Sequence, residues 1–471
     1  MRSTPQQAAI VISAKICFNC YCLRQALVYF TPIALLNKCV KFTEDTTMPE
    51  YVIKGGVRLH GEVTPSGNKN AALPLIAATL LTNEPVTLHN VPRIRDVLAL
   101  LKLVESLGAN VEWVADNSVR VHAKNVNTTT LNSDLCRAIR ASILLAGPML
   151  ARTGQITLPP PGGDVIGRRR LDTHFLVLRA LGTEINIGRD FGFSAQQLTG
   201  ADIMLDEASV TATENAITTA VLAQGSTILR NVASEPHVQD LCHCLVKMGA
   251  HIHNIGSNVL TIHGVQKLHG CEFTVGTDNI EVTSFIVLGA VIGDGILIHN
   301  ARPEDHRMTH IMLGRLGIEF ERRGEDIFVP GGQQLRIVPD LGGAIPKIDD
   351  GIWPSFPADA MSLVVVAATQ AEGTIMIHEK MFESRLYFVD RLIGMGAQIV
   401  VCDPHRVVIQ GKSQLHDDRV QSPDIRAGVA LVIAALCAKG ESVIGNISQI
   451  ERGYERFDEK LRKLGAQIER K

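Results

Sequence analysis

Hydrophobic and polar positions follow one pattern that occurs six times along the chain. In each copy a helical stretch ends at a glycine and a run of alternating apolar and polar residues follows, as in SLGANVEW around Gly108. Glycine tolerates the left-handed backbone that commonly ends a helix, and alternation is typical of a half-buried strand. The glycines are spaced 67 to 79 residues apart: Gly108, Gly182, Gly249, Gly317, Gly396 and Gly465.

A second feature recurs in phase with these glycines. It is a helix-length run rich in Ala, Leu and Val, and the six runs begin at Asn70, Arg140, Thr213, Thr283, Asp359 and Arg426. A helix that is apolar on nearly every side must be buried. Most runs lead into a short strand that ends in a turn residue, namely Asn90, Asn231, Asn300 or Asn446.

Six such units predict an α/β protein with two pseudo-symmetric domains of three units each. Helix N-termini carry partial positive charge and free N–H groups, so buried helices that point their starts at a shared cleft would bind anions. We therefore expect the site in the cleft between the domains, and the residues at the helix starts are its candidates.

Composition agrees with a globular protein and limits its partners. The chain has 471 residues, of which 46% are hydrophobic and 20% are charged, and its formal net charge is -2. This charge argues against nucleic acid as a partner, and no apolar run is long enough to predict a transmembrane helix. Ten cysteines in a chain of this length do not indicate a disulfide scaffold, so we expect a reducing cytoplasm.

The first 47 residues lie outside the repeat. They contain Cys17, Cys20 and Cys22 among short apolar blocks and basic residues, and Met48 follows them directly. They resemble no signal peptide, so we interpret residues 1–47 as a disordered extension or as sequence translated upstream of the native start. The three cysteines lack a second ligand pair with zinc spacing, and we predict neither a metal nor a cofactor.

The segment 158–174, LPPPGGDVIGRRRLDTH, combines a Gly-Gly pair, one carboxylate and three arginines. Gly162 and Gly163 can act as a hinge ahead of Asp164, and the arginines at 168–170 offer fork-shaped donors suited to phosphate or carboxylate. Two interpretations are open: a mobile, anion-holding catalytic loop, or a solvated basic turn.

Charged residues at the starts of the buried runs need a partner. Lys69, Arg140 and Arg426 place cations where the helix dipole is positive, which costs stability unless an anion compensates. Asp359 follows the stiff sequence WPSFPA and is either a helix N-cap or a carboxylate held in place for chemistry. Four more charged residues lie in turns after strands, where salt bridges or surface roles are the default: Asp96, Glu235, Arg385 and Arg452.

Eight short motifs together resemble one family. They are SGNKNA, RASI, GGDVIGRR, SVTATEN, FPAD, ESR, DIRA and ERGYE, and the similarity extends from about Tyr51 to the C-terminus. The chain is similar to the UDP-N-acetylglucosamine 1-carboxyvinyltransferases, which are enolpyruvyl transferases of the EPSP synthase superfamily. The resemblance implies a two-domain inverted α/β barrel of six units. The first domain would contain residues 69–276, and the second would contain residues 48–68 and 277–471.

The resemblance also implies an activity. Such an enzyme transfers the enolpyruvyl group of phosphoenolpyruvate to the 3-hydroxyl of UDP-N-acetylglucosamine and releases phosphate. This is the first committed step of peptidoglycan precursor synthesis, so it would serve cell-wall biogenesis, cell shape and cell division from the cytoplasm. The reaction needs charge neutralisation, one base and one acid, and no metal, cofactor, nucleic acid or membrane.

Matched motifs imply a role for each candidate residue. Lys69, Arg169 and Arg452 would bind the phosphate of phosphoenolpyruvate, and Arg385 and Arg426 would bind its carboxylate. Asp359 would be the base and Asp164 the proton donor, and Lys69 and Arg452 would complete the catalytic set. Asp96 and Asp424 would support the charged groups. The UDP-sugar pocket would contain Asn70, Arg140, Arg169, Arg170, Leu171, Asp172, His174, Ser209, Val210, Thr213, Asp359 and Met381.

Three departures from the family pattern stand out. Most members have a cysteine at the position of Asp164, so we expect this chain to be insensitive to fosfomycin, which alkylates that cysteine. An aspartate has an ordinary pKa of about 3.9, which is low for a proton donor. Exclusion of water together with the negative charge of the substrate would have to raise the pKa of Asp164. The familiar LPGGC is here LPPPGGD, and Arg170 replaces a proline near the nucleotide.

Three other functions remain open at this point. The related transferase that acts on shikimate 3-phosphate shares the fold and the phosphoenolpyruvate chemistry, but it lacks the GGDVIGRR loop. An enolpyruvyl transferase could act on another nucleotide-sugar, because Arg170 changes the nucleotide end. A paralogue could also bind a UDP-sugar without turning it over, although the lysine, the arginines and both carboxylates are retained.

Overall fold

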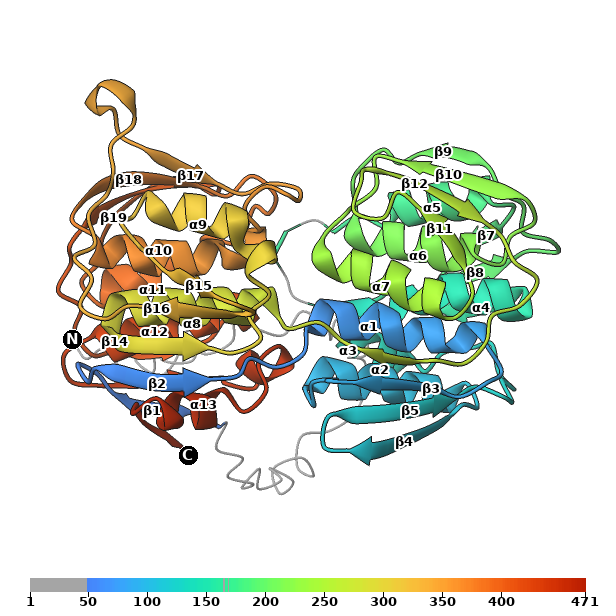
Figure 1. Cartoon of the computed structure of the whole chain (residues 1–471), viewed down its shortest axis with the longest axis horizontal. Coiled ribbons are helices and arrows are strands. Elements are labelled where there is room, and N and C mark those ends of the chain that lie inside the picture. Colours follow the sequence, from blue (N-terminus) through green and yellow to red (C-terminus); the bar gives the residue numbers. More distant parts are fainter. Residues whose placement is uncertain (1–48, 164–165, 168) are drawn as a thin grey trace, which may run out of the picture. The chain divides into compact units, whose positions relative to one another are not determined.

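In the part of the chain that the structure describes, six small β-sheets form the framework of the fold, one for each repeat that the sequence predicts (Figure 1). The computed structural model describes residues 49–163, 166–167 and 169–471. Three sheets consist, in spatial order, of β13 (Glu272–Thr274), β3 (Val86–His89), β5 (Ser118–His122) and β4 (Asn110–Ala115); of β6 (Gln155–Leu158), β8 (Phe191–Ser194) and β7 (Glu184–Ile187); and of β11 (His251–His253), β12 (Val259–His263), β10 (Ser226–Arg230) and β9 (Asp202–Met204).

The other three sheets consist, also in spatial order, of β15 (Glu321–Arg323), β16 (Asp326–Val329), β14 (Gly293–Ile298) and β2 (Leu59–Val63); of β17 (Lys347–Asp349), β18 (Gly373–His378), β20 (Arg406–Gly411) and β19 (Gln398–Asp403); and of β21 (Arg419–Gln421), β22 (Glu441–Gly445), β1 (Tyr51–Lys54) and β23 (Gln467–Arg470).

All six sheets share one topology. A short edge strand runs parallel to a second strand, and two antiparallel strands complete the sheet, as β9, β10, β12 and β11 do. In the three-stranded sheet the parallel edge is reduced to a single bridge between Thr130 and Thr157. The six predicted units are therefore confirmed as repeats of one αβ design.

The helices fall into two classes that the hydrophobic pattern distinguishes. The buried class consists of α1 (Lys69–Ala78), α4 (Ala146–Thr153), α6 (Val210–Ala220), α8 (Asn279–Ile292), α10 (Met361–Gln370) and α12 (Ile425–Cys437). The other helices are α2 (Arg95–Ser106), α3 (Ser133–Ala138), α5 (Asp172–Ala180), α7 (Pro236–Lys247), α9 (Arg307–Gly314), α11 (Val389–Gly394) and α13 (Phe457–Lys463). Short 3-10 helices are η1 (Thr79–Leu81), η2 (Arg140–Leu145), η3 (Pro303–His306), η4 (Leu341–Gly343), η5 (Ala358–Ala360) and η6 (Ile450–Arg452). Across the described residues, no helix is both long and apolar enough to cross a bilayer.

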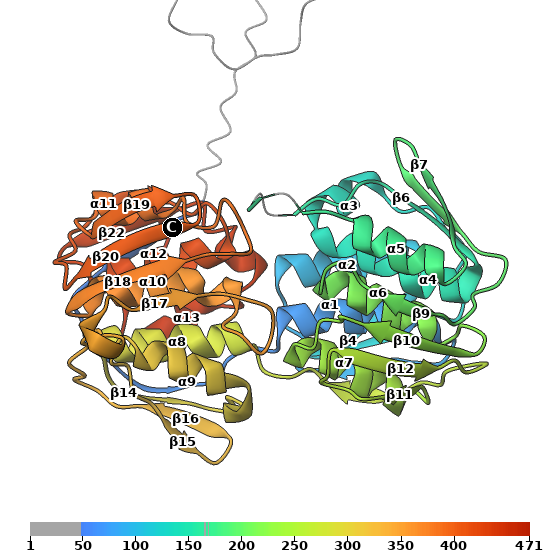
Figure 2. The same ribbon diagram turned by 90° about the horizontal axis from the view of Figure 1, so that it is seen from above.

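Two separate hydrophobic cores divide these elements. One core draws on residues 71–275, which we call lobe 1, and the other draws on residues 51–63 and 280–468, which we call lobe 2. In lobe 2 the buried helices α8, α10 and α12 contact one another inside their three sheets (Figures 1 and 2). Because the apolar bodies of these helices are packed in the core, only their starts are available to form a site.

Two edge strands are exchanged between the lobes. Strand β2 precedes α1 of lobe 1, yet it pairs with β14 of lobe 2. Strand β13 precedes α8 of lobe 2, yet it pairs with β3 of lobe 1. The N-terminal β1 also completes a lobe 2 sheet, because it lies between β22 and β23. The chain thus crosses between the lobes twice, and each crossing is fixed by backbone hydrogen bonds.

The repeated glycines and asparagines adopt the backbone that the sequence predicts. All six glycines have φ between +73° and +104°, and Asn90, Asn231, Asn300 and Asn446 have φ between +49° and +59°. Both residue types tolerate the left-handed region better than others do, which explains their recurrence at these turns.

Three predicted starts of buried helices need correction. Helix α6 begins at Val210 rather than Thr213, and α8 begins at Asn279 rather than Thr283. The carboxylate of Asp278 caps α8 by accepting the N–H groups of Ile280 and Glu281, so polar residues ahead of the apolar run belong to its first turn. The run from Arg140 begins as the 3-10 helix η2 and becomes α-helical only from Ala146.

Candidate active site

A cavity of about 390 Å³ contains most of the predicted site residues. Its walls include the starts of α1, η2 and α6 from lobe 1 and the starts of η5 and α12 from lobe 2. The predicted residues that line it are Lys69, Asn70, Asp96, Arg140, Arg169, Arg170, Ser209, Val210, Asp359, Met381, Arg385, Arg426 and Arg452. Residues far apart in the sequence therefore meet at one cavity, as the repeat pattern predicts.

Asp96 holds one pair of cations. Its carboxylate lies 2.6 Å from Lys69 Nζ and 3.0 Å from Arg452 Nε, and all three side chains are largely buried. Burial alone would raise the pKa of Asp96, but the charges of Lys69 and Arg452 outweigh it and lower the pKa below its ordinary value. Asp96 belongs to α2 of lobe 1 and Arg452 to η6 of lobe 2, so this ion pair joins the lobes.

Asp359 holds a second pair of cations. One carboxylate oxygen accepts a hydrogen bond from Arg385 Nη2 at 2.7 Å, and the other accepts from Arg426 Nη2 at 2.8 Å and Nε at 3.1 Å. Burial opposes ionisation, yet the two guanidinium groups lower the pKa of Asp359 far below its ordinary value. The Asp359 side chain caps neither η5 nor α10, so the N-cap interpretation is wrong.

Arg385 and Arg426 retain hydrogen-bonding capacity in the interior. They are 4% and 5% exposed, and among the described residues Arg385 Nε and Arg426 Nη1 have no hydrogen-bond partner. An unpaired buried donor is costly, which indicates that a ligand supplies the missing acceptor. Counted with Lys69 and Arg452, four cations face two carboxylates, so the cluster keeps a positive excess suited to an anion.

The cavity lining also contains Arg140 beside Arg169. Arg140 Nη2 donates to the backbone carbonyl oxygens of Arg169 at 2.9 Å and Arg170 at 3.1 Å. Burial and the charge of Arg169 lower the pKa of Arg140 to about 10. Ser209, the residue before α6, lines the same region, where the helix start adds partial positive charge. This part of the cavity lining also favours an anionic group.

The loop that carries the predicted proton donor is described only in part, and Asp164 itself lies outside the described residues. A Cβ atom at Gly162 would lie 1.7 Å from the Arg137 carbonyl oxygen, and Gly163 has φ of +108°, so both positions require glycine. Further along, Ser384 N donates to the Ile166 carbonyl oxygen at 3.2 Å, which connects the loop to lobe 2.

Five predicted residues do not line the cavity: Leu171, Asp172, His174, Thr213 and Asp424. His174 and Thr213 lie behind the wall, where His174 bonds Thr211 and Asn215 and Thr213 accepts the Ala233 N–H. Burial first, and then Arg140, lower the pKa of His174 to about 3. The carboxylate of Asp424 accepts the N–H groups of Arg426 and Ala427, so it supports Arg426 through the backbone and not through an ion pair. Asp172 pairs with Arg170 at 3.0 Å.

The sequence analysis did not single out Glu214 and His237, which line the cavity, and Glu235, for which a salt bridge or surface role was the default, lines it as well. Glu214 and His237 are buried, Glu235 is half-buried, and each has an unpaired polar atom. Burial raises the pKa of Glu214, and the nearby Glu235 raises it further. A glutamate within a helix that the sequence predicts to be buried was the available signal. In the described part of the chain no His, Cys, Asp and Glu side chains form a metal-binding group of three or more.

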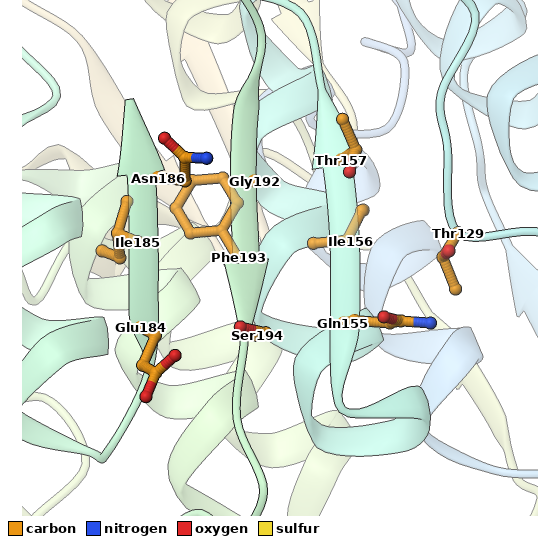
Figure 3. Close-up of a pocket in the computed structure, with 10 residues that line it drawn as sticks. All are labelled: Thr129, Gln155, Ile156, Thr157, Glu184, Ile185, Asn186, Gly192, Phe193 and Ser194. Atoms are coloured by element: carbon orange, nitrogen blue, oxygen red, sulfur yellow. The ribbon is translucent and has the colours of Figure 1, made fainter. Parts of the chain in front are cut away.

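A second hollow, of about 520 Å³, lies against the sheet β6–β8–β7 (Figure 3). Its lining side chains follow three neighbouring strands, with Thr129 beside them. The lining contains one charged residue, Glu184, and none of the predicted site residues. It therefore lacks the cation pairs that distinguish the cavity between the helix starts.

Comparisons with known proteins agree with this geometry. The family profile for EPSP synthase (3-phosphoshikimate 1-carboxyvinyltransferase) matches residues 53–461. The chain is 55% identical over 424 residues to the UDP-N-acetylglucosamine 1-carboxyvinyltransferase of Treponema denticola, an alignment that covers 90% of this chain and 100% of the relative. It is also 55% identical over 421 residues to the enzyme of that name from Bradyrhizobium diazoefficiens, covering 89% of this chain and 98% of the relative. The crystal structure of the enolpyruvyl transferase NikO from Streptomyces tendae matches with a TM-score of 0.80 and 25% identity, covering 90% of this chain and 99% of NikO.

Proposed function

The chain belongs to the family of UDP-N-acetylglucosamine 1-carboxyvinyltransferases, and from this premise we propose that it transfers the enolpyruvyl group of phosphoenolpyruvate to the 3-hydroxyl of UDP-N-acetylglucosamine. One observation carries the proposal: Arg385 and Arg426 are buried, share Asp359, and each keep an unpaired donor. A small carboxylate would complete both guanidinium groups.

Phosphoenolpyruvate carries two anionic groups, and the cavity contains two clusters of cations. We assign its carboxylate to Arg385 and Arg426, and its phosphate to Lys69, Arg169 and Arg452. A planar carboxylate suits two guanidinium forks, whereas a phosphate can take the Lys69 ammonium as a point charge. The positive excess of the two ion clusters would be neutralised when this anion binds.

Binding would also create the base. In the free protein Asp359 is the partner of the two arginines, which keeps its pKa low and makes it a poor proton acceptor. The substrate carboxylate would compete with Asp359 for Arg385 and Arg426, and a carboxylate released from that pairing becomes more basic. Asp359 would then accept the proton of the sugar 3-hydroxyl as this oxygen attacks C2 of phosphoenolpyruvate.

The remaining steps balance as addition followed by elimination. As the O3–C2 bond forms, the π electrons of the double bond take a proton at C3, which we assign to Asp164. In the elimination we assign the C3 proton back to the carboxylate that Asp164 became in the first step; its C–H electron pair restores the double bond, and the C2–O bond breaks as phosphate leaves with that bond's electrons. Donors placed at the leaving phosphate stabilise the charge that develops on it, and we assign Lys69 and Arg452 to this task.

The UDP-sugar would occupy the end of the cavity near Arg140, Ser209 and Val210, with its 3-hydroxyl directed to Asp359. The start of α6 and the neighbouring arginines suit a diphosphate. Arg170 lines the cavity and is paired with Asp172. Its effect on the choice of nucleotide-sugar is tested with a panel of UDP-sugars. We place the reaction in the cytoplasm, as the first committed step of peptidoglycan precursor synthesis.

The direct test is phosphate release from phosphoenolpyruvate with a panel of UDP-sugars. Release that depends on UDP-N-acetylglucosamine supports the proposal. Release with a different sugar would transfer the activity to another nucleotide-sugar, and binding without release would identify a non-catalytic paralogue.

Fosfomycin gives a second test. We propose that the protein is insensitive to it, because Asp164 offers no thiol to alkylate. Preincubation with the drug should leave the rate of phosphate release unchanged and add no mass to the chain. Time-dependent inactivation with drug mass on a residue of the loop would refute this insensitivity.

A further inference from the structure

Behind the turn that carries Arg385, two carboxyl groups meet inside lobe 2. Asp350 follows β17 and Glu379 follows β18, and these parallel strands pair Asp349 with His378 at their last shared position. The register therefore brings Asp350 and Glu379 to the same ends of adjacent strands. Asp350 is 1% exposed and Glu379 is 0% exposed.

The two carboxyl groups have very different hydrogen bonds. Asp350 accepts the backbone N–H of Lys380 with one oxygen and that of Met381, at 3.3 Å, with the other. Neither oxygen of Glu379 has a hydrogen-bond partner. Both oxygens of Asp350 thus accept hydrogen bonds in the described residues, whereas the oxygens of Glu379 lack comparable partners.

The groups that face Glu379 oppose its ionisation on balance. Burial raises its pKa to about 9, and the negative charge of Asp350 contributes in the same direction. The Arg385 guanidinium and the Phe382 N–H lower the pKa less. From the turn between β19 and β20, His405 bonds the backbone oxygen of Glu379 and not its side chain. A proton on Glu379 would supply the missing donor between the two carboxyl groups.

Glu379 of this pair lies just ahead in the chain of Arg385, the residue that we assign to the carboxylate of phosphoenolpyruvate. Asp350 accepts the N–H groups of Lys380 and Met381, and the turn that follows at residues 383–388 contains Arg385. Arg385 Nη2 bonds Asp359, while Arg385 Nε stays unpaired within reach of the charge of Glu379. An ionised Glu379 would be a competing acceptor for that Nε.

We propose that Asp350 and Glu379 share one proton at neutral pH and that this pair positions Arg385 for the carboxylate of phosphoenolpyruvate. The inference rests on the proposed function for the role of Arg385. When Glu379 loses its proton to solvent, its carboxylate attracts Arg385 Nε and weakens the hold of Arg385 on the substrate. Glu379 acts through Arg385 and is a positioning residue.

The kinetic test compares Glu379→Gln, Glu379→Ala and the control Glu372→Gln, which changes an exposed glutamate just ahead of the same strand. We expect wild-type KM for phosphoenolpyruvate to rise about tenfold between pH 7 and pH 10, with a smaller change in kcat. Glu379→Ala should raise KM about tenfold already at pH 7, and Glu379→Gln should recover most of that loss because its amide still donates to Asp350.

The pH profile separates positioning from a merely structural role. Glu379→Gln should lack the alkaline rise in KM, and Glu372→Gln should keep it. The proposal is overturned if Glu379→Gln and the wild type show the same rise, or if the loss in Glu379→Ala falls on kcat alone.

A stability measurement tests the shared proton even if the chain releases no phosphate. A pKa raised in the folded state means that wild-type stability is lost as pH rises from about 4.5 through about 9. The melting temperature of Glu379→Gln should therefore exceed that of the wild type by a margin that grows across this range. Parallel melting curves for the two proteins would show that Glu379 holds no shared proton, whereas a growing margin without phosphate release would leave the pair standing and reject the proposed function.

Discussion

Asp359 and Glu379 are carboxyl groups of the same lobe that meet their surroundings in opposite ways. Asp359 lies between two guanidinium groups, which lower its pKa despite its partial burial. Glu379 lies beside Asp350, and in the described residues its carboxyl oxygens lack the guanidinium partners that Asp359 has; its pKa is raised to about 9. The two sites share Arg385, so one cation faces both a charged and a protonated acid.

Burial raises the pKa of both carboxyl groups, so the opposite directions of their shifts come from their charged neighbours. The same reasoning applies to Asp164, because it follows two glycines and precedes three arginines in the sequence. By analogy with Asp359, arginines alone would keep this acid ionised. We infer that a proton donor at this position depends on exclusion of water and on the negative charge of bound substrate, just as burial and the charge of Asp350 both raise the pKa of Glu379.

The largest effect is expected for Asp164→Ala. Turnover should be abolished, because no other acid is assigned to deliver the proton to C3, and removal of a positioned acid typically costs roughly a hundredfold to ten-thousandfold. Affinity for the UDP-sugar, measured by calorimetry, should change little. Unchanged turnover would remove Asp164 from the mechanism.

A smaller and two-sided effect is expected for Asp359→Asn. Loss of the base should lower kcat by roughly a hundredfold or more, while loss of the competing carboxylate should tighten binding of phosphoenolpyruvate. The free variant should be less stable by about 2 kcal/mol or more, because Arg385 and Arg426 lose their common partner. Steady-state kinetics measures the loss of kcat, and thermal unfolding with and without phosphoenolpyruvate measures the changes in stability and in ligand binding. Equal stabilisation of variant and wild type by the ligand would contradict the competition between substrate and Asp359.

The smallest effect is expected for Asp350→Asn. Removing the negative neighbour should lower the pKa of Glu379, so the alkaline rise in KM for phosphoenolpyruvate should begin at lower pH. At pH 7 we expect a change of only about twofold in KM, since a neutral amide still accepts one backbone N–H. A pH profile that matches the wild type would show that Asp350 does not act on Glu379.

Local backbone requirements made much of the fold predictable. The six glycines could be identified because helix ends demand a left-handed residue at a fixed place in each unit, and the asparagines mark a matching demand after the strands. The hydrophobic pattern did not predict the exchange of β2 and β13, and only the family resemblance implied that residues 48–68 belong with the second domain and residues up to 276 with the first. Which sheet accepts an edge strand depends on contacts between segments more than 180 residues apart.

The candidate site was predictable where charge conflicts with local structure. Lys69 and Arg426 stood out because cations oppose the dipole at a helix start, and each now has a carboxylate partner. Asp350 and Glu379 gave no such signal, because either residue alone reads as an ordinary strand end. Their meeting is a consequence of strand register, which the sequence does not state.

One incubation decides most about this protein. The purified chain is mixed with phosphoenolpyruvate and UDP-N-acetylglucosamine, and the sugar product is identified by mass spectrometry and NMR alongside phosphate release. We predict an enolpyruvyl ether at the 3-oxygen of the sugar in amounts equal to the phosphate released. An unchanged UDP-sugar, with or without phosphate, would contradict the proposed transfer.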